Sequence, residues 1–317
     1  MASSGIYTFT TTRDEIIRQA ALMVGAPAAG GTMMARTVMD FAHQLNAIVK
    51  RWEAKGIHLW TESEATLFPV PGQVRYSMGN GATDHIAETV YETTLSGSEA
   101  LGQTTLSVTS ITNMADNMII GIMLDSGVLH WSAINGTPGG GTVTIDDALP
   151  SAAASGRKVY FYSSRIQRPL KIVDYRKHEI SSALEIPVLL AARFDYFNMT
   201  DKAAAGEMQM AYFESRRLAA NVYLYKVPQT VTHLLKFTWY KPLEIFSDAD
   251  DNPDLPAEWT QALEYNLAVA MLPQYPGKKQ NEINLMIGLA QKYEQDLAGW
   301  DREPEGIQIQ VDHDGRG

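Results

Sequence analysis

Hydrophobic positions recur at helical spacing near both ends of the chain. A capping-box pattern at Thr12 precedes an apolar stretch that predicts a first helix, which Gly25 ends. A second apolar stripe predicts a helix from about Met33 to Lys55. Toward the C-terminus, the same periodicity predicts helices over about 256–272 and about 280–299.

The middle of the chain has the pattern of strands. From about Glu88 to Ser164, short runs rich in Thr, Val and Ile are separated by glycine turns, as in a small antiparallel sandwich or barrel. The segments after Arg165 are mixed: 170–180 resembles a strand and 185–199 a helix. Two further strands are predicted after them, with Pro228 between the two.

This order of elements predicts an α+β fold. We expect a helical core built from both chain ends, with a small antiparallel β-sandwich or barrel domain inserted in the middle. The expected parts are 1–87 and 165–300 for the helical core, 88–164 for the inserted β domain, and 301–317 for an extended C-terminal arm.

Composition narrows the possible functions. The 317 residues carry a net charge of −10 and contain no cysteine. Proteins that bind DNA through its phosphates usually have an excess of basic residues, so the net negative charge argues against a DNA-binding regulator. An acidic surface repels phosphate and is therefore compatible with a protein along which DNA passes without being bound. Because there is no cysteine, thiolate metal sites and disulfides are excluded. Separately, the sequence has no apolar run long enough for a membrane helix and no pattern of a secretory signal, so neither is expected.

The acidic stretch Ser247–Trp259 is a candidate calcium loop. Three polar residues from Asp248 onward have the one–three–five spacing of an EF-hand. Pro253 stands where that loop needs glycine, however, and Trp259 stands where it needs a bidentate glutamate. The sequence therefore favours a solvated loop in front of a helix whose first turn contains Pro256.

No catalytic, metal or cofactor site is predicted. The seven histidines lack the spacing of a zinc helix, and the chain has neither a phosphate loop nor a nucleophile elbow. Two alternatives stay open. Glu62 and Glu64 could be the acid and base of a cell-wall hydrolase, and Trp131 could stack on a carbohydrate. Both are more simply interpreted as a surface pair and a packed strand residue.

Basic residues cluster in one region of the sequence. The cluster contains Arg165, Arg168, Lys171, Arg176 and Lys177. It is either a solvated strand face or a patch that binds a phosphate backbone or an acidic partner.

Two motifs lie on either side of the β-rich region. One is "FPVPGQVRYSMG", with Pro71, Gly72, Gln73 and Tyr76. The other is "DNPDLPAEWTQALEYNLAVAMLPQY", with matching positions Pro253, Leu255, Pro256, Glu258, Trp259, Leu263, Leu267, Ala268 and Tyr275. Together with the first helices, these motifs resemble head-to-tail adaptor proteins of short-tailed phages. The β-rich region resembles the β domain that longer adaptors carry as an insertion.

The resemblance implies a structural virion protein rather than an enzyme, without cofactor or metal. Such a protein would be assembled in the host cytoplasm as a homo-oligomeric ring, expected to be a dodecamer, beneath the portal protein. It would extend the channel for double-stranded DNA without reading its sequence, help retain packaged DNA, and dock tail nozzle, hub or fibre proteins. The alternatives are a nozzle, tube or accessory tail protein and, less favoured, a cell-wall hydrolase.

The C-terminal arm contains an alternating run, "IQIQV". A polar segment of this kind builds no core of its own, yet it can add as a strand to the edge of a partner's sheet. Ile307, Ile309 and Val311 are therefore predicted to bind the portal. The alternative is a disordered chain end.

Overall fold

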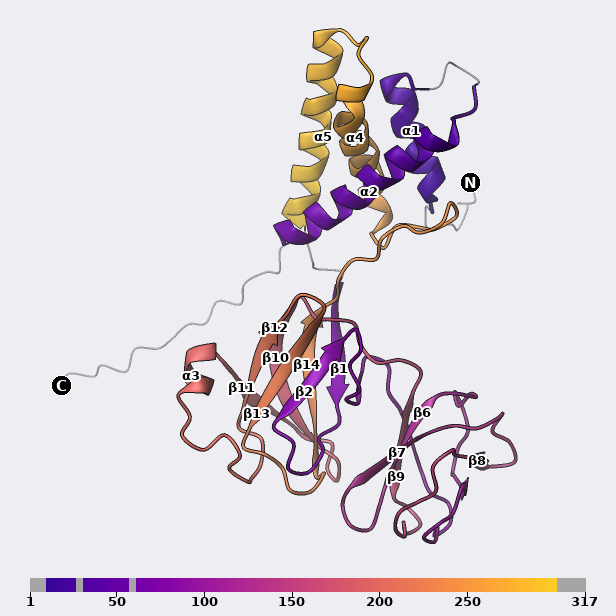
Figure 1. Ribbon diagram of the computed structural model, residues 1–317, viewed down its shortest axis with the longest axis vertical. Coiled ribbons are helices and arrows are strands. Elements are labelled where there is room, and N and C mark those ends of the chain that lie inside the picture. Colours follow the sequence, from indigo (N-terminus) through magenta and orange to yellow (C-terminus); the bar gives the residue numbers. More distant parts are fainter. Residues whose placement is uncertain (1–9, 27–30, 57–60, 301–317) are drawn as a thin grey trace, which may run out of the picture. The chain divides into compact units, whose positions relative to one another are not determined.

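The computed structural model describes residues 10–26, 31–56 and 61–300. The chain forms two compact units, a helical unit and a β unit (Figure 1). The helical unit contains the residues up to Thr61 and those from Leu243 onward, whereas the β unit is Glu62–Pro242. The fold is therefore α+β, with an antiparallel, barrel-like β unit inserted into a helical unit built from both chain ends, which confirms the predicted fold class.

Four α-helices and a short 3₁₀-helix make up the described core of the helical unit. They are α1 (Arg13–Val24), α2 (Ala35–Lys55), η2 (Ala257–Trp259), α4 (Thr260–Met271) and α5 (Gln280–Trp300), and a 3₁₀ turn, η3 (Leu272–Gln274), follows α4. The predicted capping box is present: the Thr12 hydroxyl accepts from the backbone N–H of Glu15, and the Glu15 carboxylate accepts from that of Thr12. Gly25 ends α1 with φ +79°, in the left-handed region that glycine tolerates.

Helix α4 is the centre of this unit and packs against α1, α2 and α5. Its sequence is apolar on most sides, and Leu263, Leu267 and Met271 are fully buried. Trp52 of α2 meets Trp259 edge to face, with ring centroids 5.2 Å apart. The two halves of the chain thus bury their largest side chains in one another, so neither half has a complete core alone. No helix among the described residues combines the length and hydropathy needed to span a membrane.

The β unit is built on an eight-stranded, nearly closed sheet. Its strand order is β2 (Arg75–Gly79), β13 (Ala219–Tyr225), β12 (Met210–Ser215), β11 (Glu185–Ala191), β10 (Lys171–Glu179), β14 (His233–Tyr240), β1 (Glu62–Leu67) and β3 (Ile86–Ala87). All neighbours are antiparallel except β11 and β12. The interior is filled by large side chains such as Tyr175, Phe237 and Trp239.

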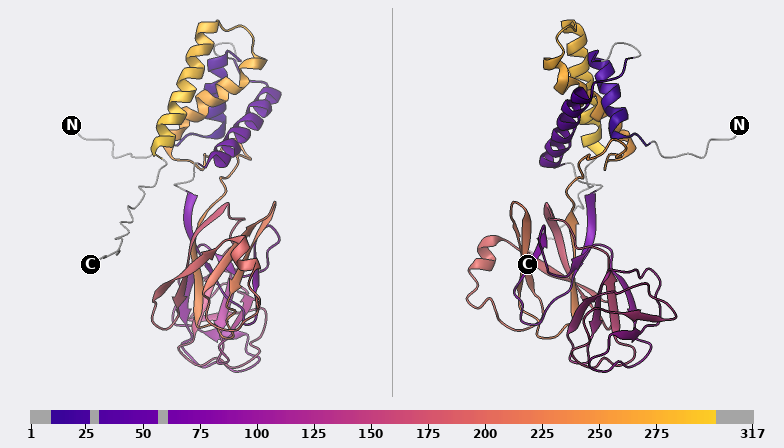
Figure 2. Two further views of the ribbon diagram at one scale, coloured as in Figure 1. Left: turned by 90° about the vertical axis from the view of Figure 1, so that its left-hand side faces the viewer. Right: turned by 45° about the vertical axis from the view of Figure 1, so that its right-hand side comes forward.

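A smaller β part lies beside the large sheet (Figure 2). It contains a four-stranded sheet in the order β4 (Tyr91–Thr94), β9 (Lys158–Tyr162), β6 (Ile119–Met123) and β7 (Leu129–Ala133), and a hairpin-like pair, β5 (Thr105–Ser107) and β8 (Thr142–Thr144). It has an aliphatic core of its own, to which Ile120, Ile122 and Val159 belong. This part corresponds to the β domain predicted at 88–164.

The β unit extends beyond the predicted boundaries. Segments 62–87 and 165–242 were expected in the helical core, but they form the eight-stranded sheet. The reason is long-range pairing: β1 and β14 are paired from Glu62 with Tyr240 to Leu67 with Leu235. Strands so distant in sequence leave no local signal that they share a sheet.

The helix predicted over 185–199 is largely wrong. Residues 185–191 form β11, and only Arg193–Phe197 form a short helix, α3. The apolar run in this segment fits either periodicity, and hydrogen bonding to β10 and β12 decides in favour of a strand. Proline at position 187 also opposes a continuous helix.

An aromatic junction joins the two sheets of the β unit. The His85 ring stacks on Trp131 at 3.9 Å with an interplanar angle of 6°, and its Nδ1 lies 2.7 Å from the Tyr162 hydroxyl. Phe68 packs edge-on against Trp131 at 5.0 Å. A side chain at Gly121 would lie 2.6 Å from the same indole, so glycine is required there. Trp131 is thus a packed strand residue, as the simpler interpretation predicted.

The junction makes the stability of the β unit depend on pH. Burial, assisted by the positive charge of Arg165, lowers the pKa of His85 to about 4. Above about pH 6.5, His85 is neutral in both the folded and the unfolded chain. Between about pH 6.5 and pH 4, only the unfolded chain binds the proton, so stability falls, by on the order of 2–3 kcal/mol.

We expect this loss in chemical denaturation at pH 7 and pH 4.5, with amide exchange in β6 and β9 reporting the β unit alone. The variant His85→Phe keeps a ring against Trp131 but cannot titrate, so its stability should decline less over the same range. An equal decline in the two proteins would contradict this role of His85.

Candidate protein-interaction site

The motif around Gly72 is a structural clamp. The Tyr76 hydroxyl accepts from the Val70 N–H at 2.9 Å and lies 3.2 Å from the carbonyl oxygens of Val70 and Gln73. Gly72 has φ +78°, which the turn requires. The Gln73 side chain donates to Asp84 at 2.6 Å, and that carboxylate also accepts from the backbone and hydroxyl of a β2 serine. The matched residues therefore hold a turn and cover the free edge of β2.

The acidic loop before α4 is structural as well. The Asp251 carboxylate accepts from the backbone N–H groups of Ser247 and Asp248 at 2.6 and 2.7 Å, which holds its pKa below the usual value. The backbone carbonyls of Ala249 and Asp251 accept from the first two N–H groups of α1, at 3.3 and 2.8 Å. The loop thus caps a helix from the other end of the chain. Across the described ranges, no three His, Asp or Glu side chains are grouped to hold a metal ion.

Arg176 is the centre of an ion-pair network on one face of the large sheet. It lies 2.8 Å from Glu64, 3.3 Å from Asp174 and 3.5 Å from Glu185, and Lys236 pairs with two of the same carboxylates. Glu64, one half of the carboxylate pair considered for a hydrolase, is therefore engaged by two cations. These side chains are partly exposed, so each pair contributes little alone, and the network is the stabilising unit.

The predicted basic cluster is divided by the fold. Arg165 donates to the Asp84 carbonyl at 3.1 Å, Arg168 to the Ser215 hydroxyl at 3.2 Å, Lys171 lies 5.9 Å from the centre of the Tyr240 ring, and Lys177 pairs with Glu207 at 2.7 Å. Arg176 and Lys177 are neighbours in β10 and so point to opposite faces. The five residues thus make separate contacts rather than one patch. The other predicted site, at Ile307, Ile309 and Val311, lies outside the described residues.

Exposed apolar side chains are concentrated on β11 and α3. The apolar surface of β11 and α3 comprises six large side chains within fourteen residues, with Leu189 and its neighbour Leu190 on opposite faces of the strand: Leu184, Ile186, Leu189, Leu190, Phe194 and Phe197. Leu189 is 61% exposed and Phe194 is 76% exposed. A concentration of this kind is typical of a protein-contact surface, whereas single exposed apolar residues are ordinary.

An aromatic cluster fixes the position of α3. Tyr196 is buried and packs on Tyr212 and Tyr223, with ring centroids 5.7 and 5.4 Å apart. Because Tyr196 is anchored to the sheet, Phe194 and Phe197 of the same short helix stay exposed. Sequence analysis missed this surface because an apolar run carries no sign of whether it is buried.

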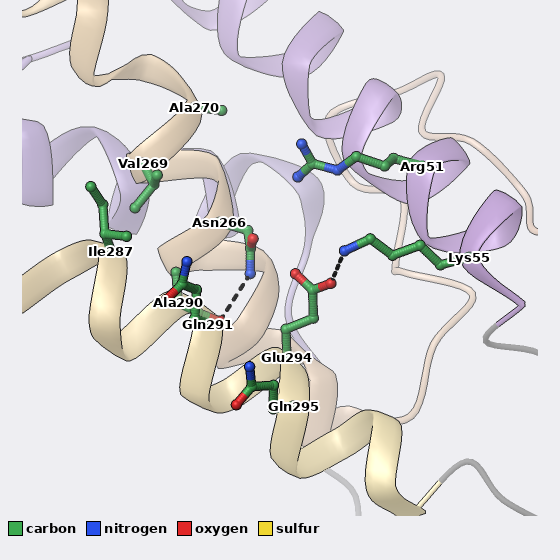
Figure 3. A pocket seen from close by; sticks show the side chains of 10 residues that line it. All are labelled: Arg51, Lys55, Asn266, Val269, Ala270, Ile287, Ala290, Gln291, Glu294 and Gln295. Atoms are coloured by element: carbon green, nitrogen blue, oxygen red, sulfur yellow. Dashed lines mark hydrogen bonds and ion pairs between the residues drawn. The ribbon is translucent and has the colours of Figure 1, made fainter.

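A groove opens on the helical unit between α2 and the α4–α5 pair (Figure 3). Its volume is about 480 Å³, and apolar side chains from α4 and α5, such as Val269 and Ile287, line part of it. The Asn266 amide donates to the Ala290 carbonyl at 3.4 Å and so ties α5 to α4. The rim is charged: Lys55 pairs with Glu294 across it, and Arg51 reaches in from α2 without forming an ion pair with any described residue.

The sequence matches no protein-family model and no curated protein. Family membership is therefore not shown by comparison. What the structure provides is the exposed apolar surface of β11 and α3, the charged groove, and two motifs with structural roles.

Replacing Tyr76 by phenylalanine should destabilise the β unit. The Val70 N–H would lose its acceptor, at a cost of about 0.5–1.5 kcal/mol in the free energy of unfolding, measured by urea denaturation. Tyr91→Phe is the matched control, because that hydroxyl forms no hydrogen bond with the described residues and its ring stacks on Phe161 at 5.4 Å. Equal effects of the two substitutions would contradict the clamp.

The acidic loop should be more sensitive at Asp251 than at Asp250. Asp251→Ala removes the acceptor of two backbone N–H groups and should cost the helical unit about 1–2 kcal/mol, whereas Asp250→Ala should be close to neutral. Thermal unfolding of both variants, with and without millimolar calcium, measures the difference. Stabilisation by calcium that depends on Asp250 would support the metal-loop interpretation instead.

Proposed function

We propose that this protein is a head-to-tail adaptor of a short-tailed phage, a structural virion protein that forms a ring under the portal. In this role it extends the DNA channel, helps retain packaged DNA and docks the tail. The observation that carries the proposal furthest is the apolar surface of β11 and α3, since a protein that works by assembly needs apolar surface left for partners.

The resemblance to adaptors gains support from what its motifs do. In the β unit, Gly72 and Tyr76 build the turn clamp. In the helical unit, the acidic loop caps α1, and Trp259 and Leu263 fill the core. Motifs of this kind identify a fold rather than a reaction, which suits a protein whose work is structural.

The distribution of charge also suits a DNA channel. Residues 1–61 and 243–317 contain 19 acidic and 11 basic residues, whereas 62–242 contain 17 and 15. The helical unit therefore carries a net charge of −8 and the β unit −2. A ring of helical units would present a strongly negative surface along which DNA slides without binding.

A nozzle, tube or accessory tail protein is the second candidate, because it would use the same apolar surface to assemble. Direct contact with the portal separates the two. The purified chain is mixed with intact portal rings of the same phage, and the product is weighed by native mass spectrometry. One copy per portal subunit supports the adaptor, and no complex supports the nozzle or accessory role.

The double variant Leu189→Ser, Phe194→Ser should assemble poorly. Each substitution removes a large apolar side chain, so ring formation or portal binding should weaken by roughly tenfold or more per side chain. Leu101→Ser is the control, because Leu101 is 70% exposed but lies outside this surface. Circular dichroism checks that both variants stay folded. Normal assembly of the double variant would remove this surface from the proposal.

A further inference from the structure

We propose that the groove between α2 and the α4–α5 pair receives the acidic segment in front of α4 from a second copy of this chain. In this contact Ile245 enters the groove and Asp250 pairs with Arg51. The inference deepens the proposed ring, because it names a contact between neighbouring copies. It rests on the proposed function only in the identity of the assembly, since two copies can make this contact whether or not a portal is their partner.

The groove is a small positive site in an acidic unit. Its three charged lining residues, Arg51, Lys55 and Glu294, carry a net charge of +1, whereas the whole helical unit carries −8. Lys55 and Glu294 neutralise each other, and Arg51 points into the groove without forming an ion pair or a hydrogen bond with the part of the chain that the structure describes (Figure 3). Its guanidinium is therefore available for charge-assisted hydrogen bonds to a carboxylate, and the groove favours an acidic occupant.

The groove also has room for an aliphatic side chain beside that charge. Val269 and Ile287 provide apolar contacts, and the short side chains of Ala270 and Ala290 leave space next to them. The volume of about 480 Å³ is within the range of sites that bind ligands. The groove thus fits a segment that presents one aliphatic side chain and one carboxylate close together.

The segment in front of α4 has this complementary chemistry. Residues 244–258 contain six acidic and no basic residues. Asp251 and Asp254 accept hydrogen bonds from backbone groups nearby, whereas the exposed Asp250 side chain makes no hydrogen bond or ion pair with the described residues. Ile245 is 54% exposed. An exposed aliphatic side chain and an unengaged carboxylate therefore lie five residues apart in one segment.

Buried neighbours hold Ile245 in its exposed position. Leu243 and Phe246 are buried in the helical core. The Asn46 side chain accepts from the Phe246 N–H at 2.9 Å and donates to the Phe246 carbonyl at 3.0 Å. Because the backbone around Ile245 is fixed in this way, the segment loses little conformational freedom when it binds.

The segment is held on the side of α2 that faces away from the groove. Asn46, Lys50 and Glu53 of α2 bind its backbone, whereas Arg51 and Lys55 line the groove. At 3.6 residues per turn, Asn46 and Arg51 lie about 140° apart around the helix. The occupant of the groove must therefore come from a second copy. Such a contact joins two different surfaces, so it is heterologous and can close into a ring.

Directional cross-linking tests this contact, since the chain contains no cysteine. One chain carries Ile245→Cys, and the other carries Val269→Cys or Ile287→Cys. The two chains are mixed and oxidised mildly, with and without intact portal rings, and disulfides between them are found by peptide mapping. At least one mixture should exceed the control about tenfold, because the contact gives the two thiols a high effective concentration. The control is Leu285→Cys, 63% exposed on α5 but outside the groove lining.

Each outcome of the cross-linking decides the proposal. A disulfide from position 245 to position 269 or 287 that exceeds the one to position 285 supports the contact. Equal yields at all three positions, or no disulfide with or without portal rings, overturn it. If the disulfide forms and the chain binds no portal, the contact stands and the adaptor function fails. If the chain binds portals without this disulfide, the adaptor function stands and the contact fails.

Charge reversal tests the ion pair in the same assay. Arg51→Glu in the groove chain, or Asp250→Arg in the segment chain, should lower the cross-link yield about tenfold. Both reversals together should restore the yield, because the pair re-forms with its charges exchanged. Arg36→Glu, exposed on α2 outside the groove lining, should leave the yield unchanged. Circular dichroism checks that each variant is folded. A double reversal that recovers nothing beyond the single ones would show that Asp250 and Arg51 do not meet.

Discussion

The pairing of β1 with β14 is the constraint on which the rest of the structure depends. The chain enters the β unit through one of these strands and leaves through the other, and the ladder holds Glu62 opposite Tyr240. An insertion of 181 residues therefore begins and ends at neighbouring points. Because its ends are so close, α1 and α2 can meet α4 and α5 as if the insertion were a short loop. The Trp52–Trp259 contact and the capping of α1 by the acidic loop both require that closure.

The two family-like motifs use one physical device. In each, a single side chain collects backbone groups that would otherwise lack partners: the Tyr76 hydroxyl in the turn before β2, and the Asp251 carboxylate in the loop before η2. Several hydrogen bonds from the backbone to one side chain restrict the conformations of a loop that has little packing to hold it. This explains how a stretch with five acidic residues can serve the fold.

Local signals in the sequence were sufficient for α1, α2, α4 and α5. Thr12 and Gly25 mark the ends of α1, and the expected spans of α2, α4 and α5 agree with the structure to within a few residues. The large sheet could not be predicted, because two of its pairs, β1 with β14 and β2 with β13, join segments more than a hundred residues apart. At the surface, closeness in sequence did not mean closeness in space, since Arg176 and Lys177 point to opposite faces of β10. The apolar surface of β11 and α3 could not be recognised either, because its composition is the same as that of a core segment.

The neighbouring ends of β1 and β14 also determine how the protein responds to mechanical load. Tension applied at Glu62 and Tyr240 would pull on the first rungs of the ladder and open it one pair at a time, which takes far less force than shearing all the rungs together. Tension applied at α1 and α5 would instead load the helical core first, and would reach the ladder only after that core had opened. The Trp52–Trp259 contact at the centre of the helices therefore shields the β1–β14 ladder from such a load.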